Sequence, residues 1–263
     1  MILFIYEGGD KEIKIHKTLD YLYFNRGEEC IVASYCSNIY SLYQKLNEMN
    51  GFGDIVTLMR ESCAEKTRAD FSKNNPFADI SESSVFSEIY LFFDYDFQES
   101  SGSLGENNDK LRELLSFFNN ETDNGKLYIN YPMVESFSYT KEIPDSKYYE
   151  YCVSREKCRN FKKEAFEFSF YKSYDALLFN FSRAISDKKY SLIRKNWDNL
   201  VIQNVKKANY ICCSKNQLPI DKNYLTQMRI FEAQCDKYVN TTICSVSILN
   251  AFPLFLFEYF IDF

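Results

Sequence analysis

The pattern that most constrains the fold is an alternation of short apolar runs with longer segments whose apolar residues recur at helical spacing. Four apolar runs predict strands, at residues 2–6, 30–36, 88–96 and 125–136. Short continuous apolar runs are typical of strands buried on both faces. Helical spacing follows in four segments, at residues 11–24, 39–49, 54–73 and 109–121. This alternation predicts right-handed βαβ units and a parallel sheet covered by helices on both faces.

The second half of the chain has a different pattern. After about residue 145 the strand signals fade, and longer helical patterns occupy residues 158–185, 190–212 and 224–239. The stretch 247–263 is apolar but too short and too interrupted to span a bilayer. We interpret it as a buried terminal helix and expect no membrane association. We therefore predict the α/β fold class, with a sheet domain at residues 1–145 and a mainly helical region at residues 146–263.

Two polar stretches and one proline are expected to interrupt the regular elements. The stretches 74–84 and 98–108 are interpreted as loops, because they are rich in Asn, Ser, Gly and acidic residues. Pro132 is expected to stop the fourth strand and to open the next helix, since proline donates no backbone hydrogen bond and suits a first helical turn.

Charge is distributed unevenly along the 263 residues, whose formal net charge is −6. Residues 1–140 carry 12 Lys and Arg against 23 Asp and Glu, a net of −11, whereas residues 141–215 carry 16 against 9, a net of +7. The basic segment predicts a surface for nucleic-acid phosphates or for an acidic partner. The alternative is a solvated helical face with scattered lysines. The candidate phosphate contacts are adjacent basic pairs: Lys162 and Lys163, Lys188 and Lys189, Arg194 and Lys195, and Lys206 and Lys207.

The nine cysteines and the single histidine bear on cellular compartment and metal chemistry. Because no signal-peptide pattern occurs, we expect reduced thiols in a cytoplasmic protein. Cysteine spacings such as that of Cys152 and Cys158 do not match a zinc knuckle, and His16 is the only histidine. A structural zinc site is therefore not expected, and we expect His16 to be an ordinary surface residue of its helix.

Carboxylates follow three of the predicted strands. Glu7 ends the first strand before a Gly-Gly turn, Asp94 and Asp96 end the third, and Glu135 follows the fourth. Ligands of parallel α/β sheets bind at the carboxyl ends of the strands, and a period of two places Asp94 and Asp96 on one face. Carboxylate oxygens are the ligands that Mg²⁺ prefers. Each residue also has a structural interpretation, because an Asp often opens a loop and a Glu suits a first helical turn.

These motifs together resemble a known family. The segment "FIYEGGDKE" resembles the E-G-x-x-D opening of the Toprim domains of OLD-type nucleases. "YLFFDYD" resembles their apolar strand ending in D-x-D, and "NYPMVES" resembles their later strand and carboxylate. The stand-alone Toprim proteins of bacterial anti-phage systems, of the RloB and AriB type, share this pattern. The resemblance covers about residues 1–140.

The resemblance implies a metal-dependent nuclease. Glu7 would be a general acid/base or a metal ligand, and Asp94 and Asp96 would bind Mg²⁺ or Mn²⁺. Glu135 and Asp10 would be further ligands, although Asp10 is equally suited to cap its helix. The implied reaction is metal-assisted cleavage of phosphodiester bonds in DNA or RNA. Lys141, after the fourth strand, is a further candidate for a phosphate contact.

The resemblance also bears on partners and leaves alternatives open. OLD nucleases carry an ATPase on the same chain, whereas no G-x-x-x-x-G-K-S/T motif occurs here. We expect a separate ATPase subunit as partner and consider a homo-oligomer. The chain would act as a nuclease effector in bacterial anti-phage defence, or as a Toprim-like binding subunit with weak or no catalysis. A third interpretation is phosphoryl transfer by a D-x-D of the haloacid dehalogenase kind, but that family places its D-x-D on the first strand.

Overall fold

The computed structural model of the protein describes residues 1–24, 30–49, 52–67, 77, 80, 83–100 and 102–261. The predicted helix at 54–73 is described only to residue 67, and the predicted loop at 74–84 is described only at residues 77, 80 and 83–84. The other parts of these two predictions lie outside the described residues.

The chain forms two compact units that interleave in the sequence. The first unit comprises Met1–Asp10, Arg26–Phe93 and Ser100–Leu127, and the second comprises Lys11–Asn25, Asp94–Glu99 and Tyr128–Phe263. This division differs from the single boundary predicted near residue 145. Segment 128–145 belongs with the C-terminal helices because its polar groups form hydrogen bonds to them. The Tyr128 hydroxyl donates to Glu258 at 2.6 Å, and the Asp145 amide donates to the side chain of Gln203 at 3.1 Å.

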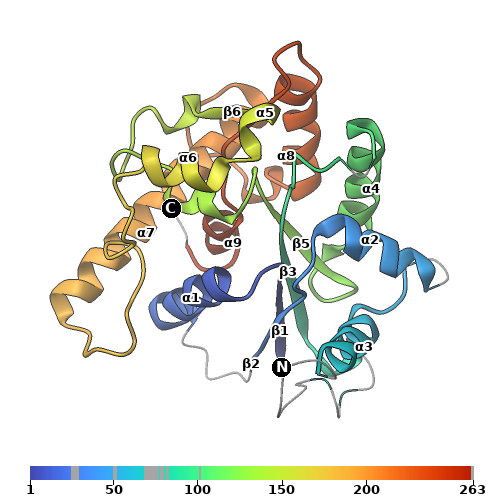
Figure 1. Ribbon diagram of the computed structural model, residues 1–263. Coiled ribbons are helices and arrows are strands. Elements are labelled where there is room, and N and C mark those ends of the chain that lie inside the picture. Colours follow the sequence, from blue (N-terminus) through green and yellow to red (C-terminus); the bar gives the residue numbers. More distant parts are fainter. Residues whose placement is uncertain are drawn as a thin grey trace. The chain divides into compact units, whose positions relative to one another are not determined.

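Among the described residues, five strands form one mostly parallel sheet in the order β2-β1-β3-β5-β4 (Figure 1). Strand β1 pairs in parallel with both β2 and β3, and β4 pairs antiparallel with β5. The α/β fold class is therefore confirmed. The bounds are β1 Ile2–Tyr6, β2 Cys30–Ser34, β3 Glu88–Asp94, β4 Asn119–Asn120 and β5 Gly125–Asn130.

Burial explains why these segments form the sheet. All five residues of β1 are buried, as are the middle five of β3, which is the pattern of strands covered on both faces. Gly125 opens β5 with φ +114°, and a Cβ there would lie 2.8 Å from Leu91 Cδ1. Only glycine fits this close approach of β5 to β3. Strand β5 ends at Asn130, before the predicted stop at Pro132, and Glu135 lies in the short 3₁₀ helix η3 (Val134–Ser138).

In the first unit, helix α2 (Ile39–Glu48) packs against both α3 (Ile55–Thr67) and α4 (Leu104–Phe117). A short 3₁₀ helix, η2 (Ser83–Val85), precedes β3. The loop predicted at 98–108 is wrong after residue 103. The Ser103 hydroxyl accepts from the Glu106 amide at 3.2 Å, and the Glu106 carboxylate accepts from the Ser103 amide at 2.7 Å. This capping box starts α4 five residues before the predicted helix.

The second unit contains most of the helices and a two-stranded antiparallel sheet. Helix α1 continues directly into the π-helical turn η1. The two elements together cover the predicted helix at 11–24. Strands β6 and β7, which the sequence did not predict, pair antiparallel. The bounds are α1 Asp10–Leu19, η1 Asp20–Phe24, η4 Tyr148–Glu150, β6 Cys152–Ser154, α5 Arg155–Cys158, α6 Phe161–Phe168, α7 Asp187–Cys213, η5 Lys222–Tyr224, α8 Gln227–Gln234, η6 Cys235–Val239, β7 Ser245–Ser247 and α9 Ala251–Tyr259.

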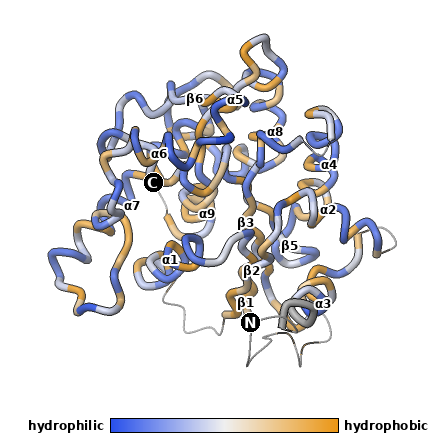
Figure 2. The backbone as a smooth tube through the Cα atoms, viewed as in Figure 1, coloured by the Kyte–Doolittle hydropathy of each residue, from blue (hydrophilic) through white to orange (hydrophobic). Residues whose placement is uncertain are grey.

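The long helix α7 organises this second unit, since it packs against α8, α9 and η4. Residues 251–257 of α9 are all buried, which confirms the predicted buried terminal helix. Figure 2 shows hydrophobic residues gathered along α9 and β1. No helix among the described residues has the length and apolar character needed to cross a membrane.

The helix predicted over 158–185 is only partly present. Helix α6 ends at Phe168, and residues 169–186 contain no helix. Side chains of α7 bind the backbone carbonyls of this segment: Asn196 donates to Ala176 O at 2.8 Å, and Trp197 Nε1 donates to Leu177 O at 2.7 Å. Tertiary hydrogen bonds therefore replace the helical ladder that the apolar spacing suggested.

Candidate functional site

The carboxyl end of β3 places two carboxylates among ordered polar groups. Asp94 is the last residue of β3, and its Oδ1 accepts a hydrogen bond of 3.0 Å from Asn130 Nδ2. The amide of the buried Tyr95 donates to Asn130 O at 3.0 Å. Asn130 thus fixes both the Asp94 carboxylate and the backbone that leads to Asp96.

Asp96 combines an unusual backbone conformation with an unusual pKa. Its φ is +47°, in the left-handed region that Asp tolerates better than most residues. Burial raises the pKa of its carboxyl to about 6; Gln98 Nε2, at 3.0 Å, acts against this rise, while the charge of Glu99 adds to it. A strained residue with a raised pKa at a strand end is typical of functional sites. Because β3 ends at Asp94, the alternation used to place both carboxylates on one face does not extend to Asp96.

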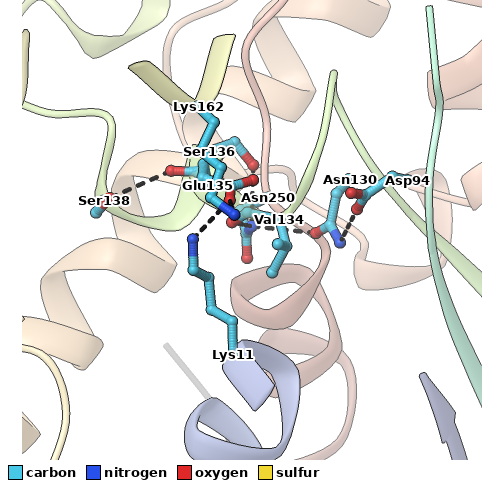
Figure 3. Close-up of polar contacts among 9 residues, drawn as sticks. All are labelled: Lys11, Asp94, Asn130, Val134, Glu135, Ser136, Ser138, Lys162 and Asn250. Atoms are coloured by element: carbon cyan, nitrogen blue, oxygen red, sulfur yellow. Dashed lines mark hydrogen bonds and ion pairs between the residues drawn. The ribbon is translucent and has the colours of Figure 1, made fainter. Parts of the chain in front are cut away.

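A buried polar network continues from Asn130 to the start of α9 (Figure 3). The side-chain amide of Asn250 donates to Asn130 Oδ1 at 3.1 Å and to Ser136 Oγ at 2.9 Å, and it also donates to Val134 O at 3.2 Å. Asn130, Ser136 and Asn250 are each at most 1% exposed. Sequence reasoning missed both asparagines, and the only available signal was an Asn directly before an apolar helix, the usual N-cap pattern.

Glu135, predicted as a further metal ligand, forms ion pairs with two lysines. Lys11 Nζ lies 2.6 Å from Glu135 Oε1, and the exposed Lys162 places its Nζ at 3.9 Å from the same oxygen (Figure 3). Burial acts to lower the pKa of Lys11, but the charge and hydrogen bonds of Glu135 and Tyr174 raise it overall. Glu135 therefore stays a predicted ligand whose carboxylate is held by ion pairs.

Glu7 and Asp10 belong to the first unit. Glu7 follows β1 directly, and its amide donates to Phe92 O at 2.9 Å, which continues the parallel register of Tyr6 with Phe92. Asp10 is exposed and is the first residue of α1. Asp94, Asp96 and Glu135 belong to the second unit.

The metal prediction can be compared with these positions. No group of three or more His, Cys, Asp or Glu side chains within the described part of the chain is arranged to hold a metal ion. Mg²⁺, however, is usually held by one or two carboxylates together with water and substrate phosphates. Asp94 and Asp96 are the two carboxylates after β3 to which this ligand number would apply.

The predicted basic pairs differ in how much charge they present. The side chains of Lys162 and Lys163 on α6 are 80% and 77% exposed. At the start of α7, Lys188 is exposed, and Lys189 Nζ donates to Asp175 O. Arg194 binds within the second unit: its Nη1 donates to Leu22 O at 2.7 Å, its Nε lies 3.2 Å from Asp198 Oδ1, and it stacks 3.9 Å from the Tyr23 ring. Lys195 is exposed and Lys206 half-buried.

Lys207 does not belong to a phosphate-binding surface, because it is completely buried. Its Nζ donates to Tyr148 O at 2.9 Å and to Tyr151 O at 2.6 Å, and burial lowers its pKa to about 7. Lys207 lies on the face of α7 that also buries Trp197, Leu200 and Asn204, and the apolar spacing of that face was the available signal.

His16 is also misplaced by the sequence interpretation, since it is 4% exposed rather than a surface residue. Its ring packs edge-on against Phe24 at 5.6 Å, and burial lowers its pKa to about 4. The eight cysteines whose side chains are described are all free thiols.

These observations define an α/β protein with a mostly parallel sheet, a candidate acidic site after β3 and a buried asparagine network beside it. No family model matches the chain, and neither a curated protein nor a solved structure gives a significant match.

Proposed function

We propose that this chain is a Mg²⁺- or Mn²⁺-dependent nuclease of the Toprim type. It would cleave phosphodiester bonds of DNA or RNA in the cytoplasm, as an effector of bacterial anti-phage defence regulated by a separate ATPase subunit. The observation that carries the proposal is the pair Asp94 and Asp96 after β3, where Asp96 has a left-handed backbone and a pKa raised to about 6. The motif resemblance supplies the reaction class.

The roles of the residues follow from their positions. Asp94 and Asp96 would hold the cation, and Asn130 orients the Asp94 carboxylate through its 3.0 Å hydrogen bond. When bound, the metal supplies Lewis-acid activation of water and neutralises charge on the phosphate. Glu7, directly after β1, is the candidate for proton transfer by its carboxylate. Glu135, whose carboxylate is paired with Lys11, would be a further ligand.

Cleavage of plasmid DNA and of tRNA, with and without Mg²⁺, tests the proposal. We expect Asp94→Asn, Asp96→Asn and Glu7→Ala each to reduce metal-dependent cleavage by about 100-fold or more, the scale seen when one electrostatic catalytic group is removed. Asp123→Asn, in an exposed turn, is the matched control and keeps wild-type activity. Wild-type rates in the Asp94 and Asp96 variants would refute the assignment.

A second candidate is a Toprim-like binding subunit without catalysis. It is favoured by the lack of a carboxylate group of three or more among the described residues and by the ion pair that occupies Glu135. The same assay separates the candidates: this function requires that wild-type protein co-purifies with an ATPase but cleaves neither substrate when Mg²⁺ is added. A dehalogenase-type phosphotransferase is disfavoured, because the D-x-D begins on β3 rather than on β1.

A further inference from the structure

Two phenylalanine rings near the end of α6 are exposed without a structural reason. Phe166 is 57% exposed and Phe170 is 72% exposed. The opposite face of the same helix buries Phe161 and Ala165, which already supply its apolar contacts to the core. Both rings therefore expose aromatic surface on the second unit, while Phe161 and Ala165 supply the buried contacts of α6.

Lysines surround these rings. Lys172 Nζ lies 5.3 Å from the centre of the Phe166 ring, and Lys141 Nζ, which donates to Phe168 O, lies 5.1 Å from that of Phe170. The exposed Lys162 and Lys163 lie on the same helix.

Carboxylates offset part of this charge, and Lys162 is paired with Glu135 at 3.9 Å. Lys163 has an ion pair with Glu167 at 3.8 Å. Glu164, also on α6, accepts a hydrogen bond of 3.4 Å from the hydroxyl of Tyr139. Lys141 and Lys172 therefore place positive charge beside the two rings, whereas Lys162 and Lys163 are paired with carboxylates.

The support beneath the rings is ordered. The Tyr139 ring is stacked between Phe161 at 5.3 Å and Phe168 at 4.2 Å. Beyond the helix, the Phe170 amide donates to Thr140 O at 3.3 Å. The backbone on both sides of the exposed rings is thus held in place, and little ordering is required when a ligand binds.

We propose that Phe166 and Phe170, with Lys141 and Lys172, form a binding platform for single-stranded nucleic acid. This proposal rests on the proposed function and names the form of its substrate. Bases stack on the two rings while the ammonium groups contact the phosphates between them, the combination typical of single-strand binding surfaces. A duplex keeps its base faces stacked internally and cannot use the rings. A protein partner is the competing occupant, since phenylalanine is enriched and lysine depleted at protein interfaces.

Fluorescence anisotropy with a labelled oligo-dT strand of about 12 nucleotides tests the platform, with a duplex of equal length as comparison. We expect Phe166→Ala and Phe170→Ala each to weaken binding of the strand by about 5-fold to 150-fold, the range for one base–aromatic stack. Leu192→Ala, an equally apolar and 45% exposed position on α7, is the matched control and leaves affinity unchanged. Lys172→Gln is expected to flatten the salt dependence of binding.

Three results would overturn the platform: tighter binding of the duplex than of the strand, unchanged strand affinity in both phenylalanine variants, or loss of a co-purifying protein in those variants with strand affinity intact. The nuclease proposal fails separately. If strand binding depends on the rings but no metal-dependent cleavage occurs, the platform is supported and the nuclease proposal is refuted. If cleavage requires Asp94 and Asp96 but is unchanged in the phenylalanine variants, the nuclease is supported and the platform is refuted.

Discussion

The buried Lys207 should make the stability of this protein depend on pH in a predictable direction. Burial lowers its pKa from the ordinary 10.5 to about 7. Between these two values the unfolded chain binds more protons than the folded protein, so the free energy of unfolding rises with pH across this window. The free energy rises because the folded protein no longer has to keep an ammonium group out of water once the amine is neutral.

The magnitude follows from the two pKa values. A difference of one pKa unit corresponds to about 1.4 kcal/mol between the two protonation states. With the folded pKa at about 7, the amine is half protonated there and neutral by about pH 9. The linkage relation then gives an increase of about 2 kcal/mol in the free energy of unfolding between about pH 7 and about pH 9.

The substitution Lys207→Met removes the titrating group and keeps the length of the side chain. Both carbonyls that lose the ammonium retain a backbone partner, because Ile248 N donates to Tyr151 O at 3.0 Å and Tyr151 N donates to Tyr148 O at 3.3 Å. We therefore expect the variant to fold. Its free energy of unfolding should lack the rise, whereas Lys206→Met, at the neighbouring half-buried position, should retain it.

Urea denaturation at several pH values between about pH 7 and about pH 9 measures this effect. Comparing wild type with Lys207→Met at each pH cancels the contributions of the other titrating groups. The free-energy difference between the two proteins should change by about 2 kcal/mol across the range. A difference that stays constant across the range would refute the assignment of a lowered pKa to Lys207.

Two further predictions concern His16 and Asn250. Since burial lowers the pKa of His16 to about 4, the free energy of unfolding should fall as pH decreases from about 6.5 to about 4. His16→Gln should reduce this loss by about 2–3 kcal/mol in urea denaturation, and an identical acid profile would contradict the reasoning. Asn250→Ala removes three buried hydrogen bonds and the N-cap of α9. It should lower the free energy of unfolding by about 2–4 kcal/mol in the same assay, against about 1 kcal/mol for Asn38→Ala at the N-cap of α2; equal losses would indicate that only the cap matters.

Local pattern was sufficient for much of the fold. The cores of β1 and β3 are visible as short apolar runs, because a strand buried on both faces needs apolar residues at every position. The helical segment predicted at 190–212 likewise falls within α7 (Asp187–Cys213), and α9 lies within the terminal helix predicted at 247–263. Element ends were less accurate: α4 starts at a capping box that the sequence contains but that the loop-like composition of 98–108 concealed.

The residues that surround the candidate site could not be predicted from local sequence pattern. The sequence named Asp94, Asp96 and Glu135 as carboxylates after strands, but it could not supply their partners. Lys11 pairs with Glu135 across 124 residues, and Asn250 reaches Asn130 across 120.

The burial of Lys207 could not be predicted from the sequence either. Lys207 was counted among the surface charges because its residue type is usually solvated, whereas packing of α7 places it against two carbonyls. The sequence determined which residues prefer to be strand, helix or strand-end carboxylate, since those preferences act over a few neighbouring residues. Tertiary structure decided which charges are paired or buried, because the pKa of a group depends on water exclusion and on partners that only folding brings close.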